Sequence, residues 1–109
     1  MVEATVLNLV QRYLQSLIGS GIPVSFGVLF GSQVTGHAHE WSDIDLLVVS
    51  PRFDGQMTRE DLRFLWIEAS DLDTRIEPVP CGEKEWREDD SRMIVEIARR
   101  QGQVVQLPG

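Results

Sequence analysis

Several features are scarce in this sequence. Cys81 is the single cysteine among 109 residues, so an internal disulfide is excluded, and no Cys/His cluster surrounds it to hold a structural metal. No apolar run reaches the roughly 18 residues that a membrane-spanning helix needs. Glu3 stands where a secretory signal would carry positive charge, which predicts a mature N-terminus. These absences favour a protein of the reducing cytoplasm, with an inert Cys81 preferred over a reactive thiol.

Positive charge is also scarce. Ten Lys and Arg residues stand against 17 Asp and Glu, and the formal net charge is −7. Affinity for long nucleic acid depends on phosphate neutralisation by basic side chains, so this balance disfavours such a partner. A cation, a metal-complexed nucleotide or another protein fits better. The length predicts one domain over residues 1–109.

Apolar residues recur at helical spacing in three segments. The stripe between Val6 and Ile18 predicts an amphipathic helix that ends at Gly19. Thr58 is the predicted N-cap of a second helix, and a third follows an acidic turn and stops at Gly102. The predicted inward faces of the last two helices are Leu62, Leu65, Trp66 and Ala69, and Met93, Ile94, Ile97 and Ala98.

Four segments have the composition of strands. Residues 22–30 and 43–50 are apolar runs of strand length, and residues 33–42 between them predict a loop after a short helical turn starting near Ser32. Residues 73–80 predict a third strand, and residues 103–107 a short final one. Pro78 and Pro80 predict that the third strand lies at a sheet edge or leaves the sheet, because proline cannot donate to a ladder.

Asp43 and Asp45 begin the second of these strands. Side chains alternate along a strand, so the two carboxylates project from one face, with Cα atoms about 6–7 Å apart. They could hold one divalent ion or border a pair of ions about 3.5–4 Å apart. Oxygen ligands favour Mg²⁺ or Mn²⁺, and Mg²⁺ commonly binds carboxylates together with substrate phosphates. The pair therefore indicates a nucleotide site.

Gly31 and Ser32 offer the phosphate side of such a site. Gly31 allows a close backbone approach, and Ser32 presents an amide and a hydroxyl near a helical turn. Alternation in the third strand puts Asp73, Arg75 and Glu77 on one face. We select Glu77 as the third acid, because its strand neighbours are apolar and a carboxylate there needs Arg75 or a metal as a partner.

Histidine and tryptophan offer weaker candidates. His37 and His39 suggest a zinc site, but two histidines in a loop without further ligands are more often exposed to solvent. Trp41, beside the acids, is a candidate for stacking on a nucleobase, whereas the helical position of Trp66 favours packing.

The motif as a whole resembles a known family. Gly31-Ser32, ten intervening residues, then Asp43-Ile44-Asp45 and Leu-Leu-Val-Val are similar to the minimal nucleotidyltransferases, small members of the DNA polymerase beta superfamily. The resemblance implies the polymerase beta-like α+β fold, a mixed β-sheet flanked by helices, which we expect on one side. It also implies two Mg²⁺ ions, or Mn²⁺, held by Asp43, Asp45 and Glu77, with Gly31 and Ser32 at the nucleotide phosphates.

Many members of this family are antitoxins paired with a helical HEPN protein. The resemblance implies a transferase that moves AMP from ATP to a hydroxyl of such a partner. One alternative is a binding subunit that neutralises the partner by covering it. Another is transfer to a small molecule, which usually needs a further domain or a homo-oligomer. Relatives often carry arginine directly after the Gly-Ser pair, where this chain has Gln33 and a loop without Arg or Lys.

Overall fold

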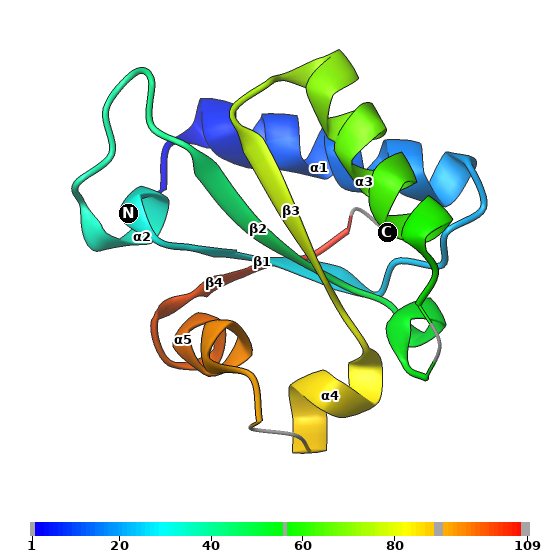
Figure 1. Ribbon diagram of the computed structural model, residues 1–109. Coiled ribbons are helices and arrows are strands. Elements are labelled where there is room, and N and C mark those ends of the chain that lie inside the picture. Colours follow the sequence, from blue (N-terminus) through cyan, green and yellow to red (C-terminus); the bar gives the residue numbers. More distant parts are fainter. Residues whose placement is uncertain (1, 56, 89–90, 108–109) are drawn as a thin grey trace.

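A computed structural model describes residues 2–55, 57–88 and 91–107. Its four strands are β1 (Phe26–Phe30), β2 (Ile44–Val49), β3 (Ile76–Cys81) and β4 (Gln103–Val105). They form one sheet in the order β3-β2-β1-β4 (Figure 1). β1 is antiparallel to both β2 and β4, whereas β2 and β3 run parallel. The predicted α+β fold with a mixed sheet is confirmed.

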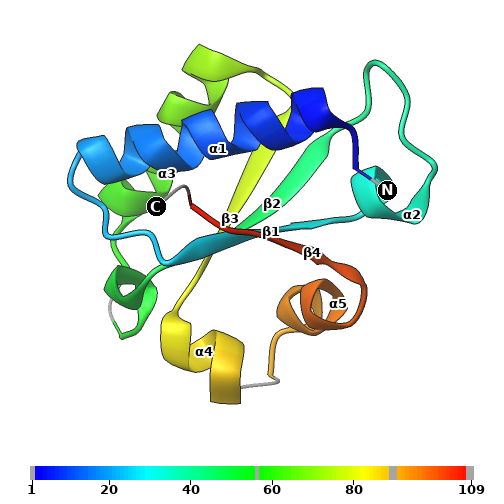
Figure 2. The same cartoon turned by 180° about the vertical axis from the view of Figure 1, so that it is seen from behind.

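Helices cover both faces of this sheet. They are α1 (Ala4–Gly19), α2 (Ser32–Thr35), α3 (Arg59–Leu72), α4 (Glu83–Glu88) and α5 (Met93–Gln101), with a 3₁₀ turn η1 (Pro51–Phe53). α1 and α3 lie on one face, and α4 and α5 lie on the other (Figures 1 and 2). The expectation of helices on one side was wrong. The reason is visible in β2, where alternating residues on both faces are apolar and both faces need cover.

The face under α1 and α3, here called the α1/α3 face, carries the larger core. Leu29, Leu46 and Val48 of the sheet pack there against Tyr13 of α1 and Leu65 of α3. The buried Tyr13 hydroxyl donates to the Leu65 carbonyl oxygen at 2.8 Å. This hydrogen bond fixes the two helices to each other without leaving a buried polar group unpaired.

The opposite face, here called the α4/α5 face, has a smaller core with polar links. Val28, Leu47 and Cys81 of the sheet pack beneath Val95 and Ala98 of α5. Burial, the largest cause, raises the pKa of the Cys81 thiol to about 12, and the charge of Glu85 adds to the shift. A thiol with this pKa stays protonated at neutral pH, as expected for an inert cysteine.

Arginine side chains fasten α4 and α5 to this face. Arg99 donates from Nε to the Trp86 carbonyl oxygen at 2.7 Å, and its guanidinium carbon lies 5.7 Å from the centroid of the Trp86 ring. Arg92 donates from Nη2 to Glu85 and to the Pro80 carbonyl oxygen, both at 2.8 Å. The α4/α5 face is thus held by charge-assisted hydrogen bonds as well as by apolar packing.

Several element boundaries differ from the sequence prediction. β3 spans Ile76–Cys81 rather than residues 73–80, and β4 ends at Val105 rather than at residue 107. β1 begins at Phe26 rather than Ile22, because Pro23 lacks an N–H and the backbone turns after α1. Residues 83–88 form helix α4 rather than an acidic turn. The Asp54 carboxylate explains this helix, since it accepts hydrogen bonds from the backbone N–H groups of Lys84 and Glu85 and so caps its first turn.

The predicted helix faces were correct only in part. Thr58 caps α3 as predicted, accepting from the Asp61 backbone N–H at 3.1 Å. Leu65 and Ala69 are buried, whereas Leu62 and Trp66 are exposed. In α5 the buried residues are Val95 and Ala98, and Met93 is 75% exposed. Met93 and Ile97 are spaced as neighbours on a helix, and so are Val95 and Ala98, so periodicity alone did not select the face that contacts β1.

The prolines of β3 lie where the sequence predicted, because β3 is the edge strand of the sheet that the described residues form, next to β2. No helix among residues 2–55, 57–88 and 91–107 combines the length and the apolar character needed to cross a membrane.

Candidate functional site

Gly31 marks the point where β1 ends and α2 begins. Its φ of +73° lies in the region that favours glycine. A Cβ atom at Gly31 would overlap the carboxylate of Asp45, because Phe30 and Asp45 are paired neighbours in the sheet. Glycine is therefore required here for two independent reasons. The turn that precedes Ser32 and the carboxylate of Asp45 are in direct juxtaposition, as the spacing of the motif predicted.

Asp45 and Glu77 are neighbours in the parallel ladder between β2 and β3. Asp45 alternates with the α1/α3-face residues Ile44 and Leu46, so it projects toward the α4/α5 face. Asp43 lies two residues before Asp45. We call Asp43, Asp45 and Glu77 the acidic cluster; it lies at the end of the sheet where β2 and β3 begin (Figure 1).

The pKa shifts show that these three acids interact. Burial raises the pKa of Asp45, and the charge of Asp43 raises it further. Burial is also the largest cause of the raised pKa of Glu77, followed by a hydrogen bond with Asp43 and the charges of Asp43 and Asp45. Like charges in one site disfavour full ionisation, and a cation would relieve this repulsion.

The cluster has donors of the right kind for a hard cation but is not closed around one. Carboxylate oxygens are the ligands that Mg²⁺ and Mn²⁺ prefer. Across the described part of the chain, however, no group of three or more His, Cys, Asp or Glu residues is arranged so that it could hold a metal ion. The two observations are compatible, because charges interact over several ångströms whereas ligation requires oxygens about 2 Å from the ion.

Asp73 forms an ion pair with Arg75. Arg75 donates to both of its carboxylate oxygens, with 2.9 Å between Nη2 and Oδ2. The hydrogen bond from Arg75 is the main cause that lowers the pKa of Asp73. Arg75 therefore pairs with Asp73, and Glu77 is left to the acidic cluster, in keeping with the choice made from the sequence.

The histidines and Trp41 do not join the acidic cluster. His37 and His39 are exposed and have local partners: His37 Nδ1 lies 3.2 Å from Thr35 Oγ1, and His39 Nδ1 accepts from the Trp41 backbone N–H at 3.3 Å. Trp41 is 76% exposed. Its role as a stacking surface stays a prediction.

Sequence reasoning missed the burial of Gln33. Its side chain is 7% exposed, and its Nε2 donates to the backbone carbonyl oxygen of Asp43 at 3.1 Å. The sequence suggested only an uncharged position in a loop. A helix as short as α2 spans four residues, too few for a periodic pattern to reveal which side chain points inward.

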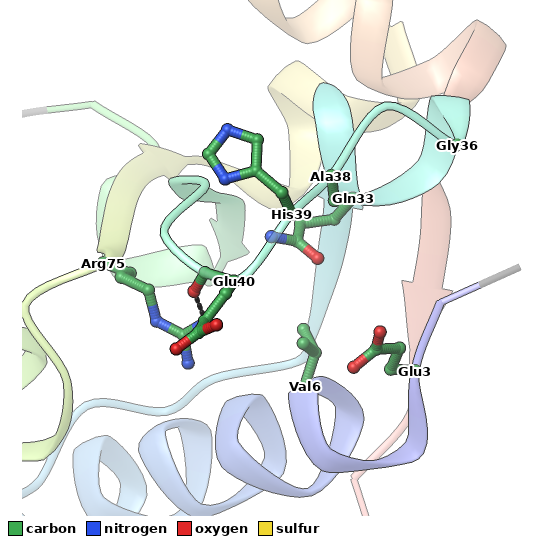
Figure 3. A pocket seen from close by; sticks show the side chains of 8 residues that line it. All are labelled: Glu3, Val6, Gln33, Gly36, Ala38, His39, Glu40 and Arg75. Carbon is green, nitrogen blue, oxygen red and sulfur yellow. Dashed lines mark hydrogen bonds between the residues drawn. The ribbon is translucent and has the colours of Figure 1, made fainter.

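A pocket of about 420 Å³ opens beside Gln33 (Figure 3). It lies between the start of α1 and the loop after α2, and Arg75 borders it while donating to the Glu40 carbonyl oxygen at 3.0 Å. The acidic cluster does not line it. Its lining residues are Glu3, Val6, Gln33, Gly36, Ala38, His39, Glu40 and Arg75.

Similarity to known proteins identifies the family of the chain. The sequence model of the nucleotidyltransferase domain family matches residues 11–101. The chain belongs to this family. No curated protein matches the sequence.

Solved structures of nucleotidyltransferases share the fold. A proposed nucleotidyltransferase from Sulfolobus solfataricus superposes with a TM-score of 0.64 at 17% identity, over 92% of this chain and 78% of that one. A toxin–antitoxin complex with AMP-PNP gives 0.60 at 23% identity, over 90% and 73%. A complex of a tri-AMPylated HEPN toxin with its MNT antitoxin, from Shewanella oneidensis, gives 0.55 at 19%, over 94% and 73%. The fold of this chain therefore also occurs in toxin–antitoxin complexes.

Proposed function

We propose that this nucleotidyltransferase domain transfers AMP from ATP to a hydroxyl group of a partner protein, as an antitoxin acting on a helical HEPN-type toxin in the cytoplasm. The observation that carries the proposal is the juxtaposition of Gly31 with Asp45, and of Asp45 with Glu77, in a chain that the nucleotidyltransferase family model covers from residue 11 to residue 101. The structural relatives with AMP-PNP and with an AMPylated HEPN toxin support the choice of nucleotide and partner.

Each residue has a role that its position supports. Gly31 lets the backbone approach the triphosphate, and Ser32 offers its amide and hydroxyl to the phosphate oxygens. Asp43, Asp45 and Glu77 would hold Mg²⁺, or Mn²⁺, which when bound supplies neutralisation of the phosphate charge. The acceptor oxygen forms a bond to the α-phosphorus, the bond to the β-phosphate oxygen breaks, and pyrophosphate leaves. Glu77 would accept the proton of the attacking hydroxyl.

The test is nucleotide transfer to the protein encoded by the neighbouring gene. The purified pair is incubated with Mg²⁺ and ATP labelled at the α-phosphate, and label on the partner is measured. We expect Asp43→Asn, Asp45→Asn and Glu77→Gln each to reduce transfer by about 100-fold or more, the scale of losing a group that stabilises the transition state. Glu60→Gln, an exposed acid at the start of α3, is the matched control and should transfer as the wild type does.

Transfer that persists in all three cluster variants would contradict the site assignment. Equal loss in Glu60→Gln would show instead that overall negative charge matters, not these three positions.

A second function is favoured by one observation. The described residues show no preformed three-ligand group for a metal, as expected if the chain only binds its partner and turns nothing over. In that case the chain neutralises the toxin by covering it. Neutralisation in cells would then survive Asp43→Asn, Asp45→Asn and Glu77→Gln, whereas the transferase predicts that all three abolish it.

A further inference from the structure

Buried polar side chains are few in the described part of the molecule: Gln33, Ser50 and Asp61. Ser50 caps η1 by accepting from the Arg52 backbone N–H, and Asp61 pairs with the Arg52 guanidinium at 2.9 Å. Ser50 and Asp61 therefore each stabilise the local structure around Arg52. Gln33 differs, because its partner is the backbone of Asp43, a member of the acidic cluster ten positions further along the chain.

Gln33 belongs to α2, whose position at the end of β1 is fixed by hydrogen bonds and packing. The backbone N–H groups of Val34 and Thr35 both donate to the Gly31 carbonyl oxygen, at 3.1 and 3.2 Å, and Val34 packs against the core of the α1/α3 face. α2 is thus fixed to the end of β1, together with Gly31 and Ser32. An amide that extends from this helix is held in place at its base.

Asp43, by contrast, follows a loop. Residues 36–41 are exposed. The hydrogen bonds within the loop are local, such as those between His39 and Ser42, and a bond from Arg75 to the Glu40 carbonyl oxygen ties the loop to the residue before β3. The hydrogen bond from the Gln33 side-chain amide to the Asp43 carbonyl oxygen links α2 directly to the residue before β2, across this loop. Together with the pairing of Phe30 and Asp45 between β1 and β2, it links the phosphate-facing turn to the first acid of the cluster.

We propose that Gln33 is a positioning residue, which holds Asp43 at the distance from Gly31 and Ser32 that a metal-bound nucleotide requires. This inference rests on the proposed function. A neutral side chain fits this position, because Gln33 is buried and an unpaired guanidinium there would be costly. Side chains that orient metal ligands typically change metal affinity by about 10–100-fold when replaced.

The test measures Mn²⁺ binding by calorimetry in the presence of AMP-PNP, without turnover. Gln33→Leu preserves size and removes the donor, and Gln33→Asn keeps an amide that is too short to reach Asp43. We expect both to bind Mn²⁺ about 10-fold more weakly than the wild type. Ser42→Ala is the matched control, because it alters the same loop next to Asp43 without removing the Gln33 bond, and it should stay within about twofold. Circular dichroism in EDTA verifies folding of each variant.

The outcomes separate the inference from the proposed function. Wild-type chain that binds no Mn²⁺ with AMP-PNP overturns both. Wild-type binding together with unchanged affinity in the Gln33 variants, or an equal loss in Ser42→Ala, overturns the role of Gln33 alone. Failure of both Gln33 variants to fold would also overturn it, because Gln33 would then be a structural residue. Weaker Mn²⁺ binding in folded Gln33 variants, with the control unchanged, supports it.

Discussion

The α1/α3 face of the sheet carries a broad apolar core, whereas the α4/α5 face joins a smaller core to arginine-mediated links and, at one end, to the acidic cluster. Adjacent residues of the same strand serve these two faces: Leu46 points to the first and Leu47 to the second. Asp45 shares the face of Leu47.

The difference shows where stability and function are located. Asp45 and Glu77 both have raised pKa values, so their ionised forms disfavour the folded chain at neutral pH. The apolar core on the opposite face offsets this cost, as is common where a functional site departs from what folding alone would select.

The largest effect is expected from Leu46→Ala and Leu47→Ala. Both leucines are fully buried, and such truncations cost about 2–5 kcal/mol. Leu46→Ala should cost more, because the larger core leaves more neighbouring atoms around the cavity. Urea unfolding of the two variants measures the difference, with Val104→Ala, at an exposed position, as the control. A larger loss in Leu47→Ala would reverse the assignment of stability to the α1/α3 face.

A smaller effect is expected from Arg99→Lys on the α4/α5 face. Lysine keeps the charge but cannot reproduce the guanidinium contacts with the Trp86 carbonyl and ring. Hydrogen bonds to charged groups contribute about 1.5–3 kcal/mol, so unfolding should need correspondingly less urea. Arg100→Lys, whose side chain is 76% exposed, should change stability by less than about 0.5 kcal/mol. Equal effects would show that charge alone holds α5.

Two aspartates should respond to pH with opposite signs. The folded-state pKa of Asp73 is lowered by Arg75, so Asp73 adds stability above its ordinary pKa of 3.8, and this is lost as pH falls through the lower folded value. The pKa of Asp45 is raised, so its stabilising contribution is present below 3.8 and lost as pH rises through the folded value.

In EDTA at pH 7, Asp73→Asn should therefore lower the thermal midpoint and Asp45→Asn should raise it. Both differences from the wild type should shrink toward pH 3. Thermal unfolding followed by circular dichroism across this range measures them. Lower stability of Asp45→Asn at pH 7 would contradict a destabilising carboxylate at this position.

The smallest expected effect is the chemical labelling of Cys81 in the folded protein. Its thiol is buried and its pKa is raised to about 12, so alkylation by iodoacetamide at pH 8 should be no faster than global unfolding. Mass spectrometry in increasing urea would detect this dependence. Rapid labelling of the folded protein would show that the α4/α5 face opens locally.

Much of the fold could be predicted from the sequence, for reasons specific to each element. α1 has a long amphipathic stripe, and β2 has a continuous apolar run, so both were identified. α4 was missed because its cap, Asp54, lies 30 residues before Lys84 in the chain. The prediction for the face of α5 was correct for Ala98 but missed Val95, because Met93 and Ile97 match helical spacing as well as Val95 and Ala98 do.

The residues of the candidate site were likewise predicted only in part. Local spacing predicted that Gly31 faces the acids at the start of β2, since one turn and one strand determine this, and Gly31 does lie against Asp45. Glu77 was selected by its apolar neighbours, and the register beside Asp45 supports that selection. Gln33 could not be predicted, because its role depends on a contact across a loop and not on a pattern in the chain.

The open edge of β3 bears on whether another strand could pair with this sheet. The carbonyl oxygens of Arg75 and Cys81 accept hydrogen bonds from the backbone N–H groups of Ile44 and Ser50, on the β2 side. Backbone polar groups alternate in direction along a strand, so those of Pro78 and Pro80 point away from β2, toward the open edge of the sheet. Neither proline has an N–H, and the outward N–H of Ile76 already donates to the Asp73 carbonyl oxygen at 3.1 Å. This edge therefore lacks the donors that a foreign strand would need, which protects it from edge-to-edge aggregation beside the acidic cluster.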